Sequence, residues 1–240
     1  MSHLPKLVAN PREIPSVIWS ENDSSLPNWT DKQWQALNRD SIRTALQKSL
    51  NVQGLWKHDL SHNKPLQPAA VLLLLIESPQ GYQVVLTTRA QHLRHHAGQV
   101  SFVGGRVETA ETIEQAALRE ATEEINLDTS SLEILGVMPH YNTISGFSVY
   151  PVVAVMSEAA WLRQPIQLDP NEVDQVFLVP LDKVLDRDRI HVHTFKFESN
   201  ERQFLSMNHQ LPEDSFFIWG ASMAIIHNFD LILRAHLSLT

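Results

Sequence analysis

The stretch GRVETAETIEQAALREATEEINL, residues 105–127, decides the fold of this chain. Thr112, followed three residues later by Gln115, forms the pattern of a capping box and marks a helix start. Apolar residues then recur at every fourth position, at Ile113, Ala117, Ala121 and Ile125. Asn126 comes next, and asparagine tolerates the left-handed backbone that ends many helices. The pattern therefore predicts one amphipathic helix over residues 113–125.

The same segment carries an excess of acids. Eight of the 27 acidic residues fall within residues 104–133, and only Arg106 and Arg119 oppose them. At about 100° per residue, three carboxylates share an arc beside the apolar stripe, those of Glu120, Glu123 and Glu124. A solvated helix face is the ordinary interpretation, but such a face usually alternates in sign. A divalent cation would relieve the repulsion, and oxygen-only ligands indicate Mg²⁺ or Mn²⁺.

The spacing of these residues resembles the Nudix box of Nudix hydrolases. Gly105 is followed by Glu111 and then by the run Arg119-Glu120-Ala121-Thr122-Glu123-Glu124, while Asn126 stands where the family has its final glycine. The resemblance implies catalytic roles for the five charged residues Glu111, Arg119, Glu120, Glu123 and Glu124. Within this set, the three helix glutamates would bind the metal and Arg119 would pair with Glu111. Gly104 and Gly105 would let the loop backbone approach metal and phosphate.

A second motif precedes the box, where three of the chain's eight glycines cluster in residues 98–105. This motif consists of Leu86-Thr87-Thr88-Arg89-Ala90, Arg94, Gly98 and Phe102-Val103-Gly104-Gly105. It resembles the signature of the coenzyme A pyrophosphatase branch of the family. Val103 departs from that signature, which has proline there. The resemblance extends from residue 67 to the C-terminus. It implies cleavage of the phosphoanhydride of coenzyme A or its derivatives to 4'-phosphopantetheine and 3',5'-ADP.

The segment between Leu86 and Val103 has no acid and carries two arginines and three histidines, Arg89, His92, Arg94, His95 and His96. Guanidinium groups bind phosphate oxygens well. Arg89 and Arg94 are therefore candidate substrate-binding residues, and the resemblance adds Gly98, Gly104 and Gly105 to them. An exposed basic loop without a ligand is the alternative. Binding of a transition metal by the histidines is a third interpretation, which no further ligand pattern accompanies.

The sequence allows more than one candidate for the group that accepts the proton of the attacking water, and more than one candidate substrate. Glu120 and the downstream Glu172 are both candidate general bases, although a loop acid before a strand is the preferred interpretation of Glu172. A Nudix hydrolase for another nucleoside-diphosphate-linked substrate, such as ADP-ribose or a dinucleotide, is the first alternative function. A catalytically silent ligand-binding or scaffold protein is the second, and the complete set of box residues argues against it.

The chain is predicted to form an α/β fold, a Nudix-type α/β/α sandwich around a mixed β-sheet, over residues 67–240. Strands are predicted at 69–76, 82–88, 100–103, 132–138, 149–156, 176–179, 191–197 and 203–207. A short helix is predicted at 180–185 and a long helix at 219–237. Residues 1–66 are predicted to be an N-terminal extension with a helix over residues 31–50. Four of the six tryptophans lie in it, which predicts packing on the main domain or in a homodimer.

Composition excludes several other classes of protein. A net charge of −8 over 240 residues argues against a general nucleic-acid binder, and the absence of cysteine excludes disulfides and thiolate metal sites. The start has no signal-peptide pattern, and the longest apolar run, residues 69–76, is far too short to span a membrane. We therefore expect a cytoplasmic protein whose partner is a small-molecule substrate. A P-loop is not present in the sequence.

Overall fold

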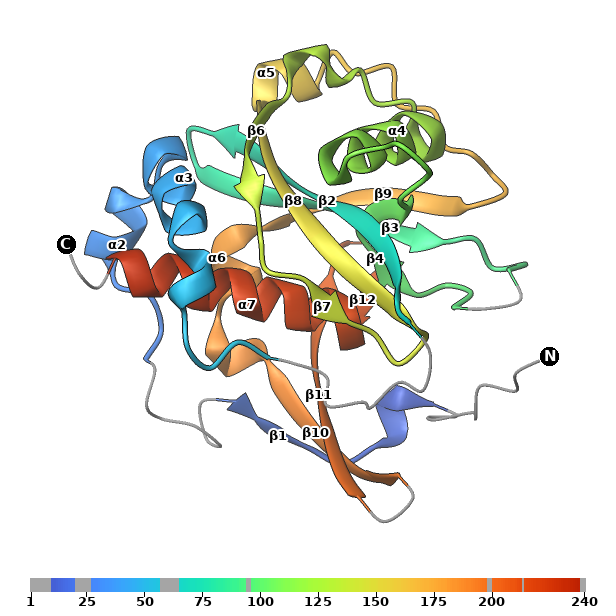
Figure 1. Ribbon diagram of the computed structural model, residues 1–240. Helices are drawn as coiled ribbons and strands as arrows, with labels where there is room; N and C mark the ends of the chain where they lie inside the picture. The colour runs from blue at the N-terminus through green and yellow to red at the C-terminus, as the bar shows by residue number, and fades with distance from the viewer. Residues whose placement is uncertain are drawn as a thin grey trace.

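The computed structural model describes residues 10–19, 27–56, 65–93, 96–197, 200–212 and 214–237. A large central sheet runs through the molecule, and a smaller sheet lies at the bottom of the view in Figure 1. Helices cover the large sheet on both sides. This arrangement confirms the predicted α/β class.

Strand β2 (Gln67–Ser78) is the centre of the large sheet, and its side chains explain its apolar sequence. Alternate residues face opposite sides, so Leu72 and Leu74 join one core while Leu73 and Leu75 join the other. The strand pairs in parallel with β8 (Phe147–Ser157). It pairs in antiparallel fashion with β3 (Gly81–Arg89) and β5 (Val103–Arg106). The sheet is therefore mixed, as predicted.

The main path of the sheet is β4-β3-β2-β8-β6, with β5 beside β2, β7 beside β8 and β9 beside β3. The remaining bounds are β4 (Val100–Ser101), β6 (Glu133–Val137), β7 (Tyr141–Asn142) and β9 (Val173–Pro180). The prediction of one strand over 100–103 is wrong. The chain leaves β3 after Ser101 and joins β2 at Val103, so two short strands meet at Phe102.

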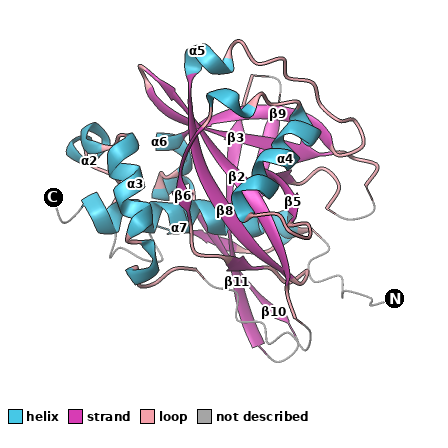
Figure 2. Ribbon diagram, turned by 45° about the horizontal axis from the view of Figure 1, so that its top comes forward, coloured by secondary structure: helices cyan, strands magenta, loops and turns pink. Residues whose placement is uncertain are grey.

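Two helices form the outer layers. Helix α4 (Ile113–Ile125) covers one face of the sheet, and α7 (Gly220–Leu237) covers the other, as the turned view in Figure 2 shows. Each helix closes its own apolar core: Ala117, Ala121 and Ile125 lie in the first, and Ile225, Phe229 and Leu233 in the second. Burial on both faces explains why β2 is apolar from Ala69 to Ile76.

The small sheet has the order β1-β10-β11-β12 and is wholly antiparallel. Its strands are β1 (Ser16–Ile18), β10 (His191–Phe197), β11 (Asn200–Gln210) and β12 (Ser215–Trp219). The sequence predicts the β10–β11 hairpin. It does not predict β1, because three residues form a strand only when β10 supplies their partners. The N-terminal segment is thus an edge of a sheet built mainly from the C-terminal part of the chain.

The single helix predicted over residues 31–50 is two helices, α2 (Asp31–Ala36) and α3 (Arg39–Gln47). Leu37 is extended, and Asn38 starts the second helix with a capping box to Ser41. Ile42 and Leu46 of α3 are buried in the core beneath α7, where Trp19 and Trp29 also lie. The two tryptophans therefore pack within their own chain.

The other elements are short: α5 (Glu158–Trp161), α6 (Leu181–Val184), and the 3₁₀ helices η1 (Pro11–Glu13), η2 (Ser49–Asn51), η3 (Thr129–Ser131) and η4 (Arg187–Arg189). Among the described residues, no helix has the length and apolar character needed to cross a lipid bilayer.

Candidate active site

Local interactions hold helix α4 at both ends. Thr112 and Gln115 form the predicted capping box, with hydrogen bonds of 3.2 and 2.8 Å. At the other end Asn126 adopts the left-handed conformation, with φ 54°. Its Nδ2 donates a hydrogen bond of 2.9 Å to the carbonyl of Pro165. Asparagine can stand in for glycine here because it accepts this φ, and its side chain also ties α4 to the loop after α5.

Arg119 is the centre of an ion network on α4. Its guanidinium donates to both carboxylate oxygens of Glu111, at 2.9 and 3.2 Å, and to the carbonyl of Arg106 at 3.0 Å. Nη1 also donates to Glu120 at 2.9 Å and to Glu123 at 2.8 Å. Hydrogen bonding to Arg119 lowers the pKa of Glu111. The network fixes the loop between β5 and α4 against the helix.

Two glycines of β5 leave space for the carboxylates. A Cβ atom on Gly105 would overlap the carboxylate of Glu120, and one on Gly104 would overlap the backbone of β2 at Ala70 and Val71. Gly104 also has a φ of 154°, which side-chain-bearing residues rarely adopt. Its backbone N–H hydrogen bonds to Glu124. Gly105 is therefore required where the helix carboxylate approaches β5, and Gly104 where β5 approaches β2.

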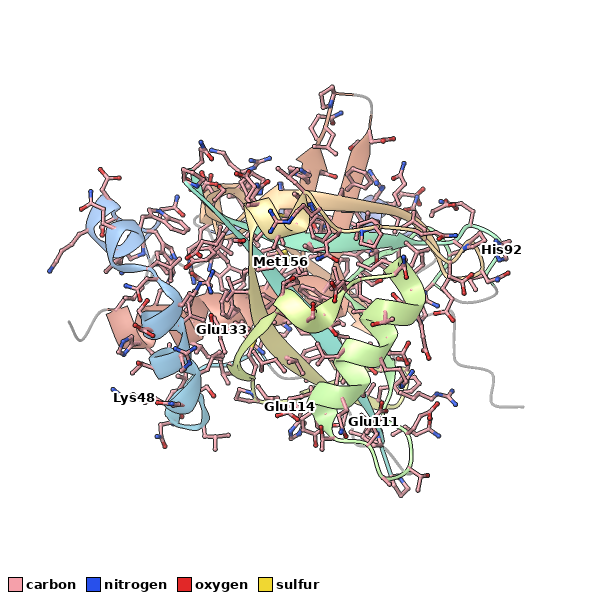
Figure 3. All side chains as sticks on the ribbon, turned by 90° about the horizontal axis from the view of Figure 1, so that it is seen from above. Lys48, His92, Glu111, Glu114, Glu133 and Met156 are labelled. Carbon is pink, nitrogen blue, oxygen red and sulfur yellow. The ribbon has the colours of Figure 1, made fainter. Side chains whose placement is uncertain are left out.

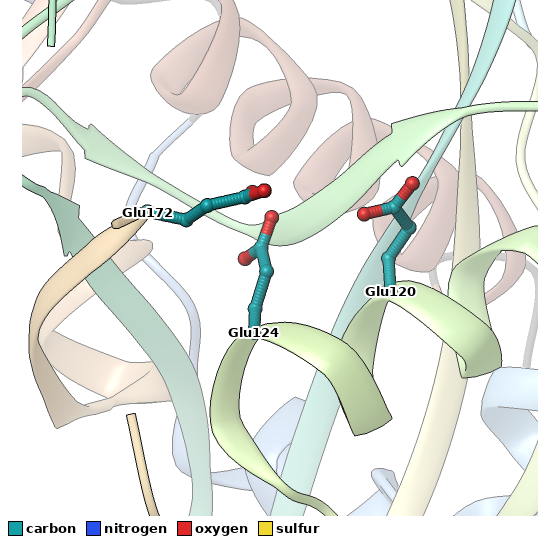
Figure 4. Close-up of side chains that lie close together, drawn as sticks. All are labelled: Glu120, Glu124 and Glu172. Atoms are coloured by element: carbon teal, nitrogen blue, oxygen red, sulfur yellow. The ribbon is translucent and has the colours of Figure 1, made fainter. Parts of the chain in front are cut away.

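Three carboxylates converge at the end of α4. Oxygens of Glu120, Glu124 and Glu172 lie within 4.8 Å of one another. Figure 4 shows the first two rising from successive turns of α4 and Glu172 reaching toward them from the segment before β9. The set offers only oxygen donors, which fits Mg²⁺ or Mn²⁺.

The electrostatics of the cluster are unfavourable for its own charges. Glu124 is 3% exposed, and burial together with the charges of Glu172 and Glu120 raises its pKa to about 8. Burial also raises the pKa of Glu120, although Arg119 opposes this effect. Carboxylates held this close favour either a shared proton or a bound cation.

A family model described as NUDIX domain matches residues 66–199, more than half of the chain. This chain belongs to the Nudix family. Over 195 residues it is 33% identical to a protein named "Uncharacterized Nudix hydrolase NudL" from Salmonella paratyphi B, covering 80% of this chain and 96% of the relative. NudL of Salmonella newport matches to the same extent. The family and the charged residues of the box together place the chain among pyrophosphohydrolases of nucleoside-diphosphate-linked substrates.

Solved Nudix structures resemble about half of the chain. The MutT protein from Methanosarcina mazei Go1 is 22% identical, with a TM-score of 0.41 over 52% of this chain and 84% of that protein. The Nudix hydrolase RenU from M. smegmatis is 26% identical, with a TM-score of 0.41 over 54% of this chain and 80% of that protein.

The structure separates Glu123 from the other two glutamates of the Nudix box. Its side chain is 59% exposed and forms an i, i+4 ion pair with Arg119. The side chain of Glu120 is 14% exposed, and both Glu120 and Glu124 face the cluster. Glu123 therefore lies on the solvent side of α4, beside the cluster, where Nη1 of Arg119 bridges it to Glu120.

Glu172 is the residue whose position the sequence does not reveal. The preferred interpretation as a simple loop acid misses that its carboxylate joins those of Glu120 and Glu124. A turn at Asp169, whose side chain accepts from the N–H of Asn171, directs the chain into β9. The N–H of Ala90 donates to the Glu172 carbonyl at 2.9 Å. The hydrogen bond between Ala90 and Glu172 joins segments about eighty residues apart, so no local sequence pattern predicts it.

The basic segment forms the turn of the Nudix domain's β3–β4 hairpin. Arg89 ends β3 and lies close enough for its charge to lower the pKa of Glu124. Gly98 has a φ of 66°, and its N–H donates to the Arg89 carbonyl at 2.9 Å. Arg94 and His95 lie outside the described residues. His92 is at the outer edge of the molecule in Figure 3, apart from Glu111.

Proposed function

We propose that this Nudix protein hydrolyses coenzyme A or its derivatives to 4'-phosphopantetheine and 3',5'-ADP, with Mg²⁺ or Mn²⁺ as cofactor. The observation that carries the proposal is the junction of two sites of opposite charge. Within the carboxylate cluster, Glu120 and Glu124 fit a divalent cation, and Glu172 lies beside them. The hairpin that follows Arg89 contains the coenzyme A-like motif and is bound to Glu172 through Ala90.

The metal-binding residues are proposed to be Glu120, Glu123 and Glu124. Glu120 and Glu124 already face one point, whereas Glu123 would have to leave its ion pair with Arg119. A bound metal would neutralise phosphoanhydride charge and lower the pKa of a bound water. Arg119 and Glu111 position the helix and loop around that point.

Glu172 is the better placed of the two candidate general bases. It is exposed, so water reaches it, and its carboxylate lies within the cluster. Glu120 is paired with Arg119 and is also a proposed metal ligand, so its carboxylate is less free to contact the attacking water. We propose that Glu172 accepts the proton of the attacking water.

Arg89 and Arg94 are proposed to bind the phosphates of the substrate. Coenzyme A carries a 3'-phosphate besides its diphosphate, and guanidinium groups match phosphate oxygens in geometry and charge. Gly98, Gly104 and Gly105 are proposed to let the backbone approach the substrate, because none of them has a side chain in the way. The homodimer expected from the aromatic extension stays a prediction, for which light scattering in solution is the check.

A substrate panel tests the function. Coenzyme A, acetyl-coenzyme A, ADP-ribose and a diadenosine polyphosphate are incubated with Mg²⁺ or Mn²⁺, and products are identified by mass. We expect coenzyme A compounds to be cleaved at the phosphoanhydride. Glu124→Gln should lower kcat by about a hundredfold or more, as removal of one charge-stabilising group commonly does. Glu114→Gln, on the same helix, is the matched control and should retain wild-type kcat.

Three results would contradict parts of the proposal. Turnover of ADP-ribose or dinucleotides but not of coenzyme A compounds would replace the substrate. Wild-type kcat in both Glu123→Gln and Glu124→Gln would overturn the metal-ligand assignment. Binding of nucleotides without turnover of any compound would favour the ligand-binding or scaffold alternative.

A further inference from the structure

A pocket of about 430 Å³ lies next to the candidate active site. Four separate segments line it: residues 10–12, parts of 88–100, residues 174–175 and parts of 214–219. They belong to the N-terminal extension, the β3–β4 hairpin, β9 and β12. The volume is in the range of small-molecule binding sites. Gly98 of the coenzyme A-like motif is one of the lining residues.

One wall of the pocket is aromatic and already holds a planar group. The rings of Phe217 and Trp219 are stacked, with centroids 6.4 Å apart and planes at 27°. The guanidinium of Arg12 lies over the Phe217 ring, 4.7 Å from its centroid. At this distance the guanidinium itself covers the ring, so a flat group can stack on the outer face of the guanidinium, which rests on Phe217.

The other described residues of the lining are polar. Among the lining residues that the structure describes, Asp174 and Asp214 face the one charge of Arg12, so these described side chains are negative in excess. The amides of Gln91 and Gln175 also line it. Amide and carboxylate groups recognise the edges of nucleobases, and a base with an exocyclic amine supplies the donors that the two aspartates accept.

The pocket adjoins the carboxylate cluster along two strands. Asp174 is two residues from Glu172, so their Cα atoms lie within about 8 Å of each other. Thr88 and Gln91 of the pocket flank Arg89 and Ala90 of the active-site side. A nucleotide can therefore place its base in the pocket while its phosphates face Arg89 and the carboxylates.

We propose that this pocket binds the adenine end of the substrate and that Arg12 of the N-terminal extension completes it. The proposal rests on the function proposed above, because it names a subsite for the same nucleotide substrate. It assigns residues 10–12 a role in substrate binding. The extension reaches this position because β1 pairs with β10 and thereby brings η1 beside β12.

Calorimetric titration of the full chain with the two halves of coenzyme A tests the subsite. These halves are 4'-phosphopantetheine and 3',5'-ADP, which is adenosine 3',5'-bisphosphate. Wild-type protein should bind adenosine 3',5'-bisphosphate. Arg12→Ala removes the group on which the base stacks and Phe217→Ala removes the ring that supports it, so each should weaken that binding about tenfold, the size of one stacking contact. The matched controls are Phe195→Ala on the same small sheet and Arg163→Ala on the surface. Neither lines the pocket, so both should bind like wild type.

The proposal would be overturned if wild-type protein did not detectably bind adenosine 3',5'-bisphosphate, or if both variants bound it as tightly as wild type. It would also be overturned if the variants lost affinity only for 4'-phosphopantetheine. Arg12 is exposed, so Arg12→Ala keeps the test valid if Phe217→Ala folds poorly. Calorimetry also separates this proposal from the proposed function. Bisphosphate binding that needs Arg12 without coenzyme A turnover would contradict only the function. Turnover with normal binding and normal KM in both variants would contradict only the subsite.

Discussion

Two groups of acids and arginines lie on opposite faces of the central sheet, and they balance charge differently. Beneath α7, the buried carboxylate of Asp230 accepts from Trp29 Nε1 at 2.5 Å and from Arg234 Nε at 2.8 Å, with Arg187 at 3.4 Å. Beside α4, the carboxylates of Glu120, Glu124 and Glu172 converge, and Arg119 reaches only the first of them.

The difference separates a charge cluster that serves packing from the cluster that is proposed to bind a metal. One acid facing two guanidinium groups leaves a positive excess, which the Pro27 carbonyl and the faces of Trp19 and Trp29 help to stabilise within the chain. Asp230 also ties the N-terminal segment to α7 through Trp29. Three converging acids leave a negative excess that folding alone does not satisfy, and the raised pKa of Glu124 records that strain. A cluster of acids whose negative charge the protein leaves unbalanced is where an external cation fits best.

The largest expected effect on stability comes from removing Asp230. Asp230→Ala leaves the buried guanidinium groups of Arg187 and Arg234 without their carboxylate, and breaking a buried pair costs about 3 kcal/mol or more. Urea denaturation measures the change in the free energy of unfolding. Asp182→Ala, which removes a half-exposed pair with Lys183, is the control and should change stability by less than about 1 kcal/mol. Equal effects of the two substitutions would contradict the comparison.

Removing Glu124 should have the opposite sign. Because its folded pKa of about 8 exceeds the unfolded value, the folded state binds more protons, and stability falls as pH rises from about 5 through 8. In chelator at pH 8, Glu124→Gln should therefore be more stable than wild type, on the order of 2 kcal/mol, with a flatter pH profile. Thermal melts across this pH range measure both properties. Mg²⁺ should raise the wild-type Tm more than that of the variant, and a destabilised variant with an unchanged pH slope would contradict the charge imbalance.

The smallest effect is expected at Glu123. Its exposed ion pair with Arg119 contributes about 0.5 kcal/mol or less, so Glu123→Gln should unfold at nearly the wild-type urea concentration. An activity loss in this variant would then report a direct role in metal binding. A large loss of stability would show instead that Glu123 belongs to the structural part of the Arg119 network.

Local patterns predicted the elements around the site well. The capping box at Thr112, the apolar repeat and the asparagine cap define α4 because neighbours within one helix turn decide them. The same reasoning joined residues 31–50 into one helix and 100–103 into one strand. Both predictions are wrong because a capping side chain at Asn38 and a change of sheet partner at Phe102 divide those segments.

The sequence by itself determined the family, the helix and the carboxylates that it presents, because their spacing follows from the helical repeat. Tertiary structure decided which acids meet. It brings Glu172 to Glu120 and Glu124, turns Glu123 to solvent, and places Arg12 over Phe217. Each of these arrangements depends on strand pairing or packing between segments far apart in the chain, and such contacts leave no periodic signal in the sequence.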